Sequence, residues 1–164
     1  MIKIQATIFI LLFFRSVVLA QSSESVLSIE GEVLQAQKVT LTQLNLFPQH
    51  EVVVKDRDGR MRKFKGVLLA TLLDSVDVTL GNQLRGENLT KYVAIKAADG
   101  YEVVYSLAEI DPSFSAHEVL VATQVDDHSL PKGEGPFRII APQDKKPARW
   151  IREVTTIRVL FAQP

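Results

Sequence analysis

The chain has 164 residues, 46% of them hydrophobic, with 19 basic residues, 19 acidic residues and no cysteine. The balanced charge argues against a nucleic-acid-binding protein, which needs a broad basic surface. The lack of cysteine excludes disulfides and thiolate metal ligands. A chain of this length can bury enough surface to fold as one domain without such cross-links.

The N-terminal residues have the pattern of a secretory signal. Lys3 precedes a largely apolar run, and Val18-Leu19-Ala20 fits the small-x-small cleavage pattern. We expect a signal peptide over residues 1–20 and a single domain over residues 21–164. No later apolar stretch is long enough to cross a bilayer, so we expect no membrane span after cleavage. Export without cysteine favours a periplasmic or secreted protein.

Most of the remaining chain is predicted to form short strands. Asp58-Gly59 and Asp99-Gly100 indicate two hairpins, because glycine tolerates a positive φ in tight turns. Short apolar or alternating runs predict strands at residues 26–29, 39–41, 51–54, 61–64, 92–97, 102–106, 119–123, 137–140 and 154–160.

Helical signals are few and short. Leucines at helical spacing predict a helix over residues 66–73. One helical turn over residues 107–110 should end at Asp111, which precedes a proline. Thr42 is predicted to cap a turn over residues 43–46. Together these elements predict an α+β domain with mixed, mainly antiparallel sheets and short helices.

Common catalytic and metal-binding patterns are missing. The histidines His50, His117 and His128 lack a metal-binding spacing, and no Gly-x-Ser-x-Gly elbow occurs. Asp126-Asp127 reads as an acidic turn, since neighbours on a strand point to opposite faces. These patterns identify no catalytic residue and no metal ligand.

Basic residues gather near the C-terminus and form the candidate site. We expect Arg138 on the open face of its strand, because it alternates with two apolar neighbours. Arg149 and Arg152 lie three apart, and such a pair can bind a phosphate or carboxylate. Equally, these cations can be the solvated face of a loop, with the arginines paired to Asp144, Glu153 or other acids. The candidate anion-binding residues are Arg138, Lys145, Lys146, Arg149 and Arg152.

Five motifs, in this order, resemble a known family. They are LSIEGEV (27–33) with VTLTQL (39–44), FKGVLL (64–69) with LL (72–73), ADGY (98–101), GEGPFRIIAP (133–142) and RWIREV (149–154). The chain resembles the molybdopterin-binding domain of the sulfite oxidase family of oxidoreductases, in a short, stand-alone, exported form. The resemblance implies a mixed sheet and a small barrel-like sheet. It also implies a molybdopterin cofactor whose phosphate is held by cations, here Arg138, Arg149 and Arg152 with Lys145 and Lys146.

The chain departs from catalytic members of that family at one position. Those members bind molybdenum through a cysteine located between the strand equivalent to residues 51–54 and the Phe-x-Gly-Val motif. Here residues 55–63 contain no cysteine. Asp56 or Asp58 could offer only a hard carboxylate, in a hairpin that we expect to be solvated, whereas a high-valent oxo-metal suits a thiolate.

We therefore expect a periplasmic domain of this family without redox catalysis, which binds a small anionic or pterin-like ligand, or a periplasmic partner protein. Two alternatives remain open. The chain could be a molybdopterin-dependent oxidoreductase that retains its cofactor without a cysteine ligand. It could instead be an interaction module whose sheet edge recruits a partner strand.

Overall fold

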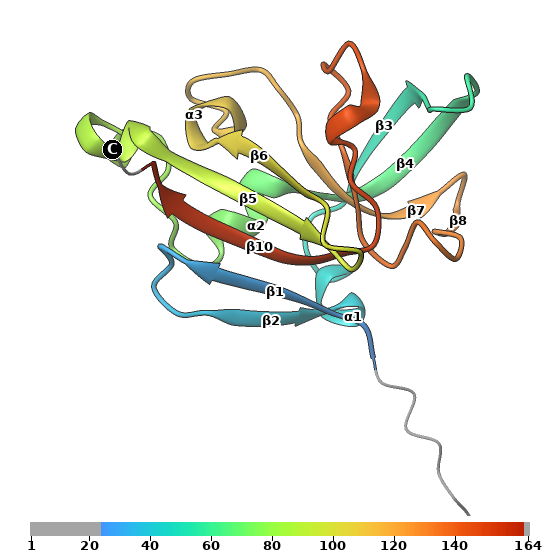
Figure 1. Ribbon diagram of the computed structural model, residues 1–164, viewed down its shortest axis with the longest axis horizontal. Coiled ribbons are helices and arrows are strands. Elements are labelled where there is room, and N and C mark those ends of the chain that lie inside the picture. The colour runs from blue at the N-terminus through green and yellow to red at the C-terminus, as the bar shows by residue number, and fades with distance from the viewer. Residues whose placement is uncertain (1–23, 163–164) are drawn as a thin grey trace, which may run out of the picture.

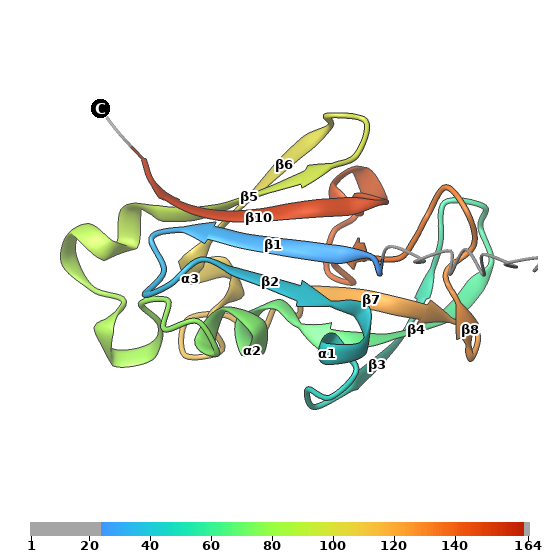
Figure 2. The same cartoon turned by 90° about the horizontal axis from the view of Figure 1, so that it is seen from below.

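The computed structural model describes residues 24–162, so the predicted signal peptide lies outside the described residues. The described chain forms two five-stranded sheets that share one hydrophobic core. The second sheet and two short helices lie on the same side of the first sheet (Figures 1 and 2). This arrangement confirms the predicted α+β class with mixed, mainly antiparallel sheets.

The first sheet is built around the last strand of the chain. Its order is β2-β1-β10-β5-β6, and only the β1–β10 pairing is parallel. Gly31 ends β1 with a φ of 95°, and a Cβ there would lie 2.0 Å from the Val159 carbonyl oxygen, so the close pairing requires glycine. The strands are β1 (Val26–Gly31), β2 (Gln37–Thr40), β5 (Lys91–Ala97), β6 (Glu102–Ser106) and β10 (Val154–Phe161).

The second sheet is antiparallel throughout and carries the site. Its order is β3-β4-β7-β8, and β9 pairs with β7. The pairing of β4 with β7 shifts register between Lys65 and Gly66, where the extra residue lies on β7, and a Cβ on the glycine would lie 2.0 Å from the Val121 carbonyl oxygen. The strands are β3 (His50–Lys55), β4 (Met61–Leu68), β7 (Leu120–Val125), β8 (His128–Ser129) and β9 (Arg138–Ile140).

Two local predictions were wrong. Strand β4 continues to Leu68, so the helix predicted from residue 66 begins only at Leu69. The residue that caps the first helix is Thr40, not Thr42: its hydroxyl accepts from the Gln43 N–H, and the Gln43 side chain accepts from the Thr40 N–H. The helices are α1 (Leu41–Leu44), α2 (Leu69–Asp74), α3 (Leu107–Ile110) and the 3₁₀ turns η1 (Gly81–Gln83), η2 (Gly86–Thr90) and η3 (Pro147–Arg149).

The core fills the space between the two sheets. Leu27 and Ile29 of β1, Phe64 of β4 and Leu72 of α2 all belong to one buried cluster. Within residues 24–162, no helix has the length and hydrophobicity needed to cross a bilayer. The site described next therefore rests on a packed scaffold with little room to shift.

Candidate functional site

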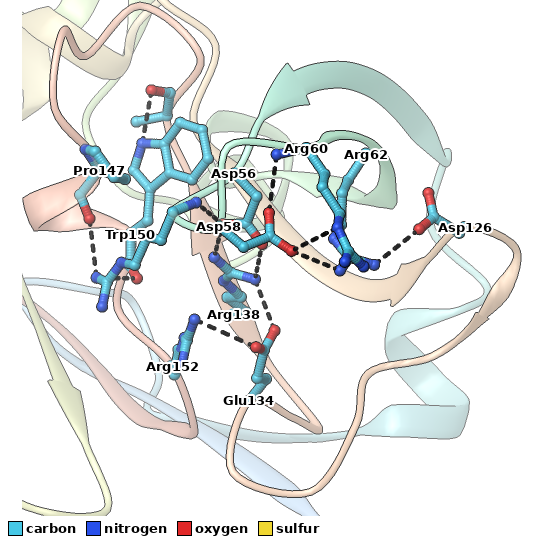
Figure 3. Close-up of polar contacts among 12 residues, drawn as sticks. Asp56, Asp58, Arg60, Arg62, Asp126, Glu134, Arg138, Pro147, Trp150 and Arg152 are labelled. Atoms are coloured by element: carbon cyan, nitrogen blue, oxygen red, sulfur yellow. Dashed lines mark hydrogen bonds and ion pairs between the residues drawn. The ribbon is translucent and has the colours of Figure 1, made fainter.

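A buried ion pair joins the ends of two strands of the second sheet. Asp56 directly follows β3 and Arg138 begins β9 (Figure 3). The guanidinium donates from Nη2 to Asp56 Oδ1 at 2.6 Å and from Nη1 to Oδ2 at 3.2 Å, and it lies 4.9 Å from the centroid of the Phe64 ring. The exposed fraction is 0% for Arg138 and 9% for Asp56. Such a two-point contact is among the stronger charge-assisted hydrogen bonds.

The prediction that Arg138 lies on an open face was wrong. Its strand is covered on both faces, since all three residues of β9 are buried. The prediction assumed that one face of the strand is exposed to solvent. Both faces of β9 are buried, so alternation does not distinguish them.

Glu134 links this pair to a second arginine. Its Oε2 accepts from Arg138 Nη1 at 2.7 Å, and its Oε1 lies 3.2 Å from Arg152 Nη2 (Figure 3). The structure therefore brings Arg138 and Arg152 together through one shared carboxylate. The Nε atoms of both arginines are buried and find no hydrogen-bond partner within residues 24–162, so this cluster retains unused donors.

The Asp56 carboxylate is fixed in its ionised form. Burial alone would raise the pKa of Asp56, but the hydrogen bonds from Arg138 and from the Arg57 backbone N–H outweigh it and hold the pKa below its ordinary value of 3.8. The sequence predicted a solvated hairpin around both aspartates. Asp58 is solvent-exposed and pairs with Arg62 at 2.8 Å, whereas Asp56 is buried.

Arg57 is the cation without a carboxylate in this cluster. Its Nη2 donates to the carbonyl oxygens of Pro147 at 2.9 Å and Trp150 at 3.1 Å, and no ion pair within the described residues involves it. Desolvation, followed by the charges of Arg152 and Arg138, lowers the pKa of Arg57. An anion placed here would relieve that repulsion.

A pocket of about 630 Å³ opens beside these arginines. Its charged lining consists of Arg57, Lys146 and Arg152 against Asp99 and Glu153, which leaves an excess of positive charge. The half-exposed ring of Tyr101 lines the pocket as well. A volume of this size suits a small organic ligand.

Arg149 lies in a separate network. Its Nη2 contacts Glu109 Oε1 at 2.7 Å and Asp144 Oδ1 at 2.5 Å, and its guanidinium lies 4.1 Å from the centroid of the Tyr105 ring. The hydrogen bonds to Asp144 and Glu109 raise the pKa of Arg149. The sequence left open whether this arginine binds an anion or pairs with an acid such as Asp144, and in the structure it pairs with Asp144.

The predicted residues therefore separate in space. Arg152 and Lys146 line the pocket, Arg138 is fully buried and does not line it, and Lys145 is exposed without lining it. Their role in binding a cofactor stays a prediction.

Sequence reasoning missed three members of the site: Asp56, Arg57 and Glu134. The first two fall in a charged Asp-Gly hairpin, which is typical of solvated turns. Glu134 lies in a glycine-proline turn. The one available signal for Asp56 was its place in the interval where the resembled family carries its thiolate.

The fold and the buried basic site define a domain of the sulfite oxidase type. The chain belongs to the oxidoreductase molybdopterin binding domain family, whose family model matches residues 59–163. The matched region begins after Asp56 and Arg57, and it includes Arg138, Lys146 and Arg152.

A similar fold occurs in the crystal structure of the sulfane dehydrogenase SoxCD from Paracoccus pantotrophus. The TM-score is 0.66 at 16% sequence identity, and the match covers 82% of this chain and 38% of that chain. The present chain thus spans about two-fifths of the length of that protein, and the likeness concerns the fold. No curated protein matches the sequence.

The residues present do not fit molybdenum held by a protein ligand. The sequence contains no cysteine. Asp56, in the interval of the missing thiolate, uses both oxygens on Arg138. Residues 24–162 bring together no group of three or more histidine, aspartate or glutamate side chains able to hold a metal ion.

Proposed function

We propose that this protein is an exported, periplasmic domain that binds a small anionic ligand and does not carry out redox chemistry. The observation that carries the proposal is the pocket lined by Arg57, Lys146 and Arg152, in which Arg57 has no carboxylate partner. A partly desolvated cation of this kind gains most from an anion that shares its hydrogen bonds.

The absence of a sulfur donor supports the non-redox part of the proposal. The carboxylate that falls in the thiolate interval is a hard ligand already satisfied by a buried guanidinium. Freeing it for a metal would leave Arg138 with Glu134 alone, which is costly for a fully buried charge.

The pocket favours a phosphate or carboxylate attached to a flat, partly apolar group. Arg57 and Arg152 offer planar guanidinium donors, Lys146 offers an ammonium group at the rim, and Tyr101 offers a ring face. A metal-free pterin phosphate is one ligand of this class.

The first test concerns what the protein carries from the cell. The full chain would be expressed in a host that makes molybdopterin and purified from the periplasm. Molybdenum would be measured by mass spectrometry, and pterin by fluorescence after acid oxidation. We expect a mature chain beginning at Gln21 and no stoichiometric molybdenum. Stoichiometric molybdenum would favour the alternative of an oxidoreductase that holds its cofactor without cysteine.

The second test concerns the pocket itself. Inorganic phosphate and benzoate would be titrated calorimetrically at low salt. We expect Arg57→Ala and Lys146→Ala to weaken binding by about tenfold each, since each removes one charge-assisted contact. Lys145→Ala is the matched control, because this neighbouring lysine does not line the pocket. Equal losses in Lys145→Ala and Lys146→Ala would show that only general charge attraction is at work.

A further inference from the structure

Strand β3 forms a free edge of the second sheet. Among the strands of the described residues, it pairs with β4 alone, and Figure 2 shows it at the outer margin of that sheet. Within residues 24–162, no backbone or side-chain group bonds to the outward backbone groups of Glu51, Val53 and Lys55. An edge of this kind can template pairing with another strand.

Three hydrogen bonds identify which residues of β3 face outward. The Asp56 N–H donates to the Arg60 carbonyl oxygen, so Asp56 points its backbone groups toward β4. The backbone groups of Lys63, the residue opposite Val53, instead bond to Asp126 on the far side of β4. The backbone N–H and C=O groups of successive residues point to opposite edges of a strand. Those of Glu51, Val53 and Lys55 therefore point away from β4.

The side chains on this edge are complementary to themselves. If a second β3 pairs antiparallel with Val53 opposite Val53, Glu51 of each copy lies opposite Lys55 of the other. Each of these is a pair of outward-facing residues that exchanges two hydrogen bonds. Val52 of one copy then lies opposite Val54 of the other on the core face. The alternation of buried and exposed residues therefore continues from one copy to the next.

The neighbouring registers fit less well. Shifting the pairing by two residues places Glu51 opposite Val53, or Val53 opposite Lys55, and loses one hydrogen-bonded pair. It also leaves the charged residues without opposite charges. The central register is therefore the one that satisfies the most backbone groups and both charges.

We propose that two copies of this chain associate through β3, with a two-fold axis at Val53, so that the second sheet becomes continuous across the dimer. The exposed fractions of Val53, 62%, and of Met61 on the adjacent strand, 64%, are high for apolar side chains. Pairing at the two-fold axis places the exposed Val53 side chains of the two copies side by side and so covers part of this apolar surface. An isologous contact of this type closes on itself and builds no filament.

The first experiment measures association of the mature chain by sedimentation velocity from about 10 µM to about 1 mM, the range in which small interfaces associate. We expect a concentration-dependent dimer. Val53→Lys places two lysines on the axis and should abolish it. Val104→Lys is the matched control, because Val104 is an exposed valine on β6, at the edge of the other sheet.

Charge reversal tests the register. Glu51→Lys and Lys55→Glu should each weaken association by about tenfold, since the symmetry applies each change twice. The double variant Glu51→Lys with Lys55→Glu should restore it, apart from a small loss from the exposed contact between Glu51 and Lys65 at 3.8 Å.

Hydrogen exchange provides a readout that does not depend on the variants. The amides of Glu51, Val53 and Lys55 should become protected as the concentration rises, whereas Val52 and Val54 are already protected by β4. A chain that stays monomeric throughout, or a dimer indifferent to both Val53→Lys and charge reversal, would overturn the proposal. Neither result depends on whether the pocket binds an anion.

Discussion

Arg138 is the largest fully buried side chain in the described structure. Its charge is compensated by Asp56 and Glu134, and Glu134 in turn contacts Arg152. A buried pair of this kind adds little to stability compared with well-packed apolar groups, but removing one partner leaves an isolated charge. The cluster is therefore sensitive to single substitutions.

We expect Asp56→Asn to lower the free energy of unfolding at neutral pH by about 3 kcal/mol, because the buried Arg138 loses one of its two carboxylate partners and keeps only Glu134. The folded-state pKa of Asp56 is depressed, so its stabilisation is fully present above the ordinary pKa of 3.8 and is lost as the pH falls through the lower folded value. The difference between the native chain and the variant should therefore shrink in acid.

Urea denaturation at several pH values between about 7 and about 3 would measure this difference. Asp58→Asn is the control: it alters the exposed aspartate of the same hairpin and should leave neutral stability nearly unchanged. A difference that stays constant down to the lowest pH would mean that the Asp56 charge is not what stabilises the site.

At the scale of the element, the hairpins were the most predictable features. Asp58-Gly59 and Asp99-Gly100 both form turns with positive φ at the glycine, as their dipeptides predicted. The start of α2 was misplaced because an apolar run serves a buried strand and a buried helix equally well. The predicted cap Thr42 was wrong because β2 ends at Thr40 and the helix begins directly after it, which puts Thr40 in the capping position.

The close pairing of β4 with β7 depends on Gly66. We expect Gly66→Ala to lower the free energy of unfolding by more than about 2 kcal/mol, because its Cβ would overlap the β7 backbone at the bulge. Gly86→Ala should cost only about 1 kcal/mol, since that glycine has a positive φ of 59° but no atom within 4 Å of the new Cβ. Equal losses, measured by urea denaturation, would contradict the close contact between β4 and β7.

At the scale of the whole molecule, local patterns could place the strands but not the contacts between them. Asp56 and Arg138 lie 82 residues apart, and Arg57 bonds to carbonyl oxygens 90 and 93 positions later in the chain. Periodicity carries no information on such pairs. The resemblance to the family supplied the order of motifs and pointed to the basic segment, yet it could not show that Arg149 is held apart from Arg152.

The shared core predicts cooperative unfolding. One buried cluster includes residues of both sheets and Trp150, the sole tryptophan. Far-ultraviolet circular dichroism and tryptophan fluorescence should therefore give the same midpoint in urea. An earlier fluorescence transition would show that the segment around the site opens before the sheets do.

The central position of β10 has a consequence for biosynthesis. Within residues 24–162 this strand is synthesised after every other strand, yet it separates β1 from β5. The first sheet therefore cannot be completed during translation until β10 has emerged from the ribosome. A nascent chain that still lacks β10 keeps the first sheet open between β1 and β5.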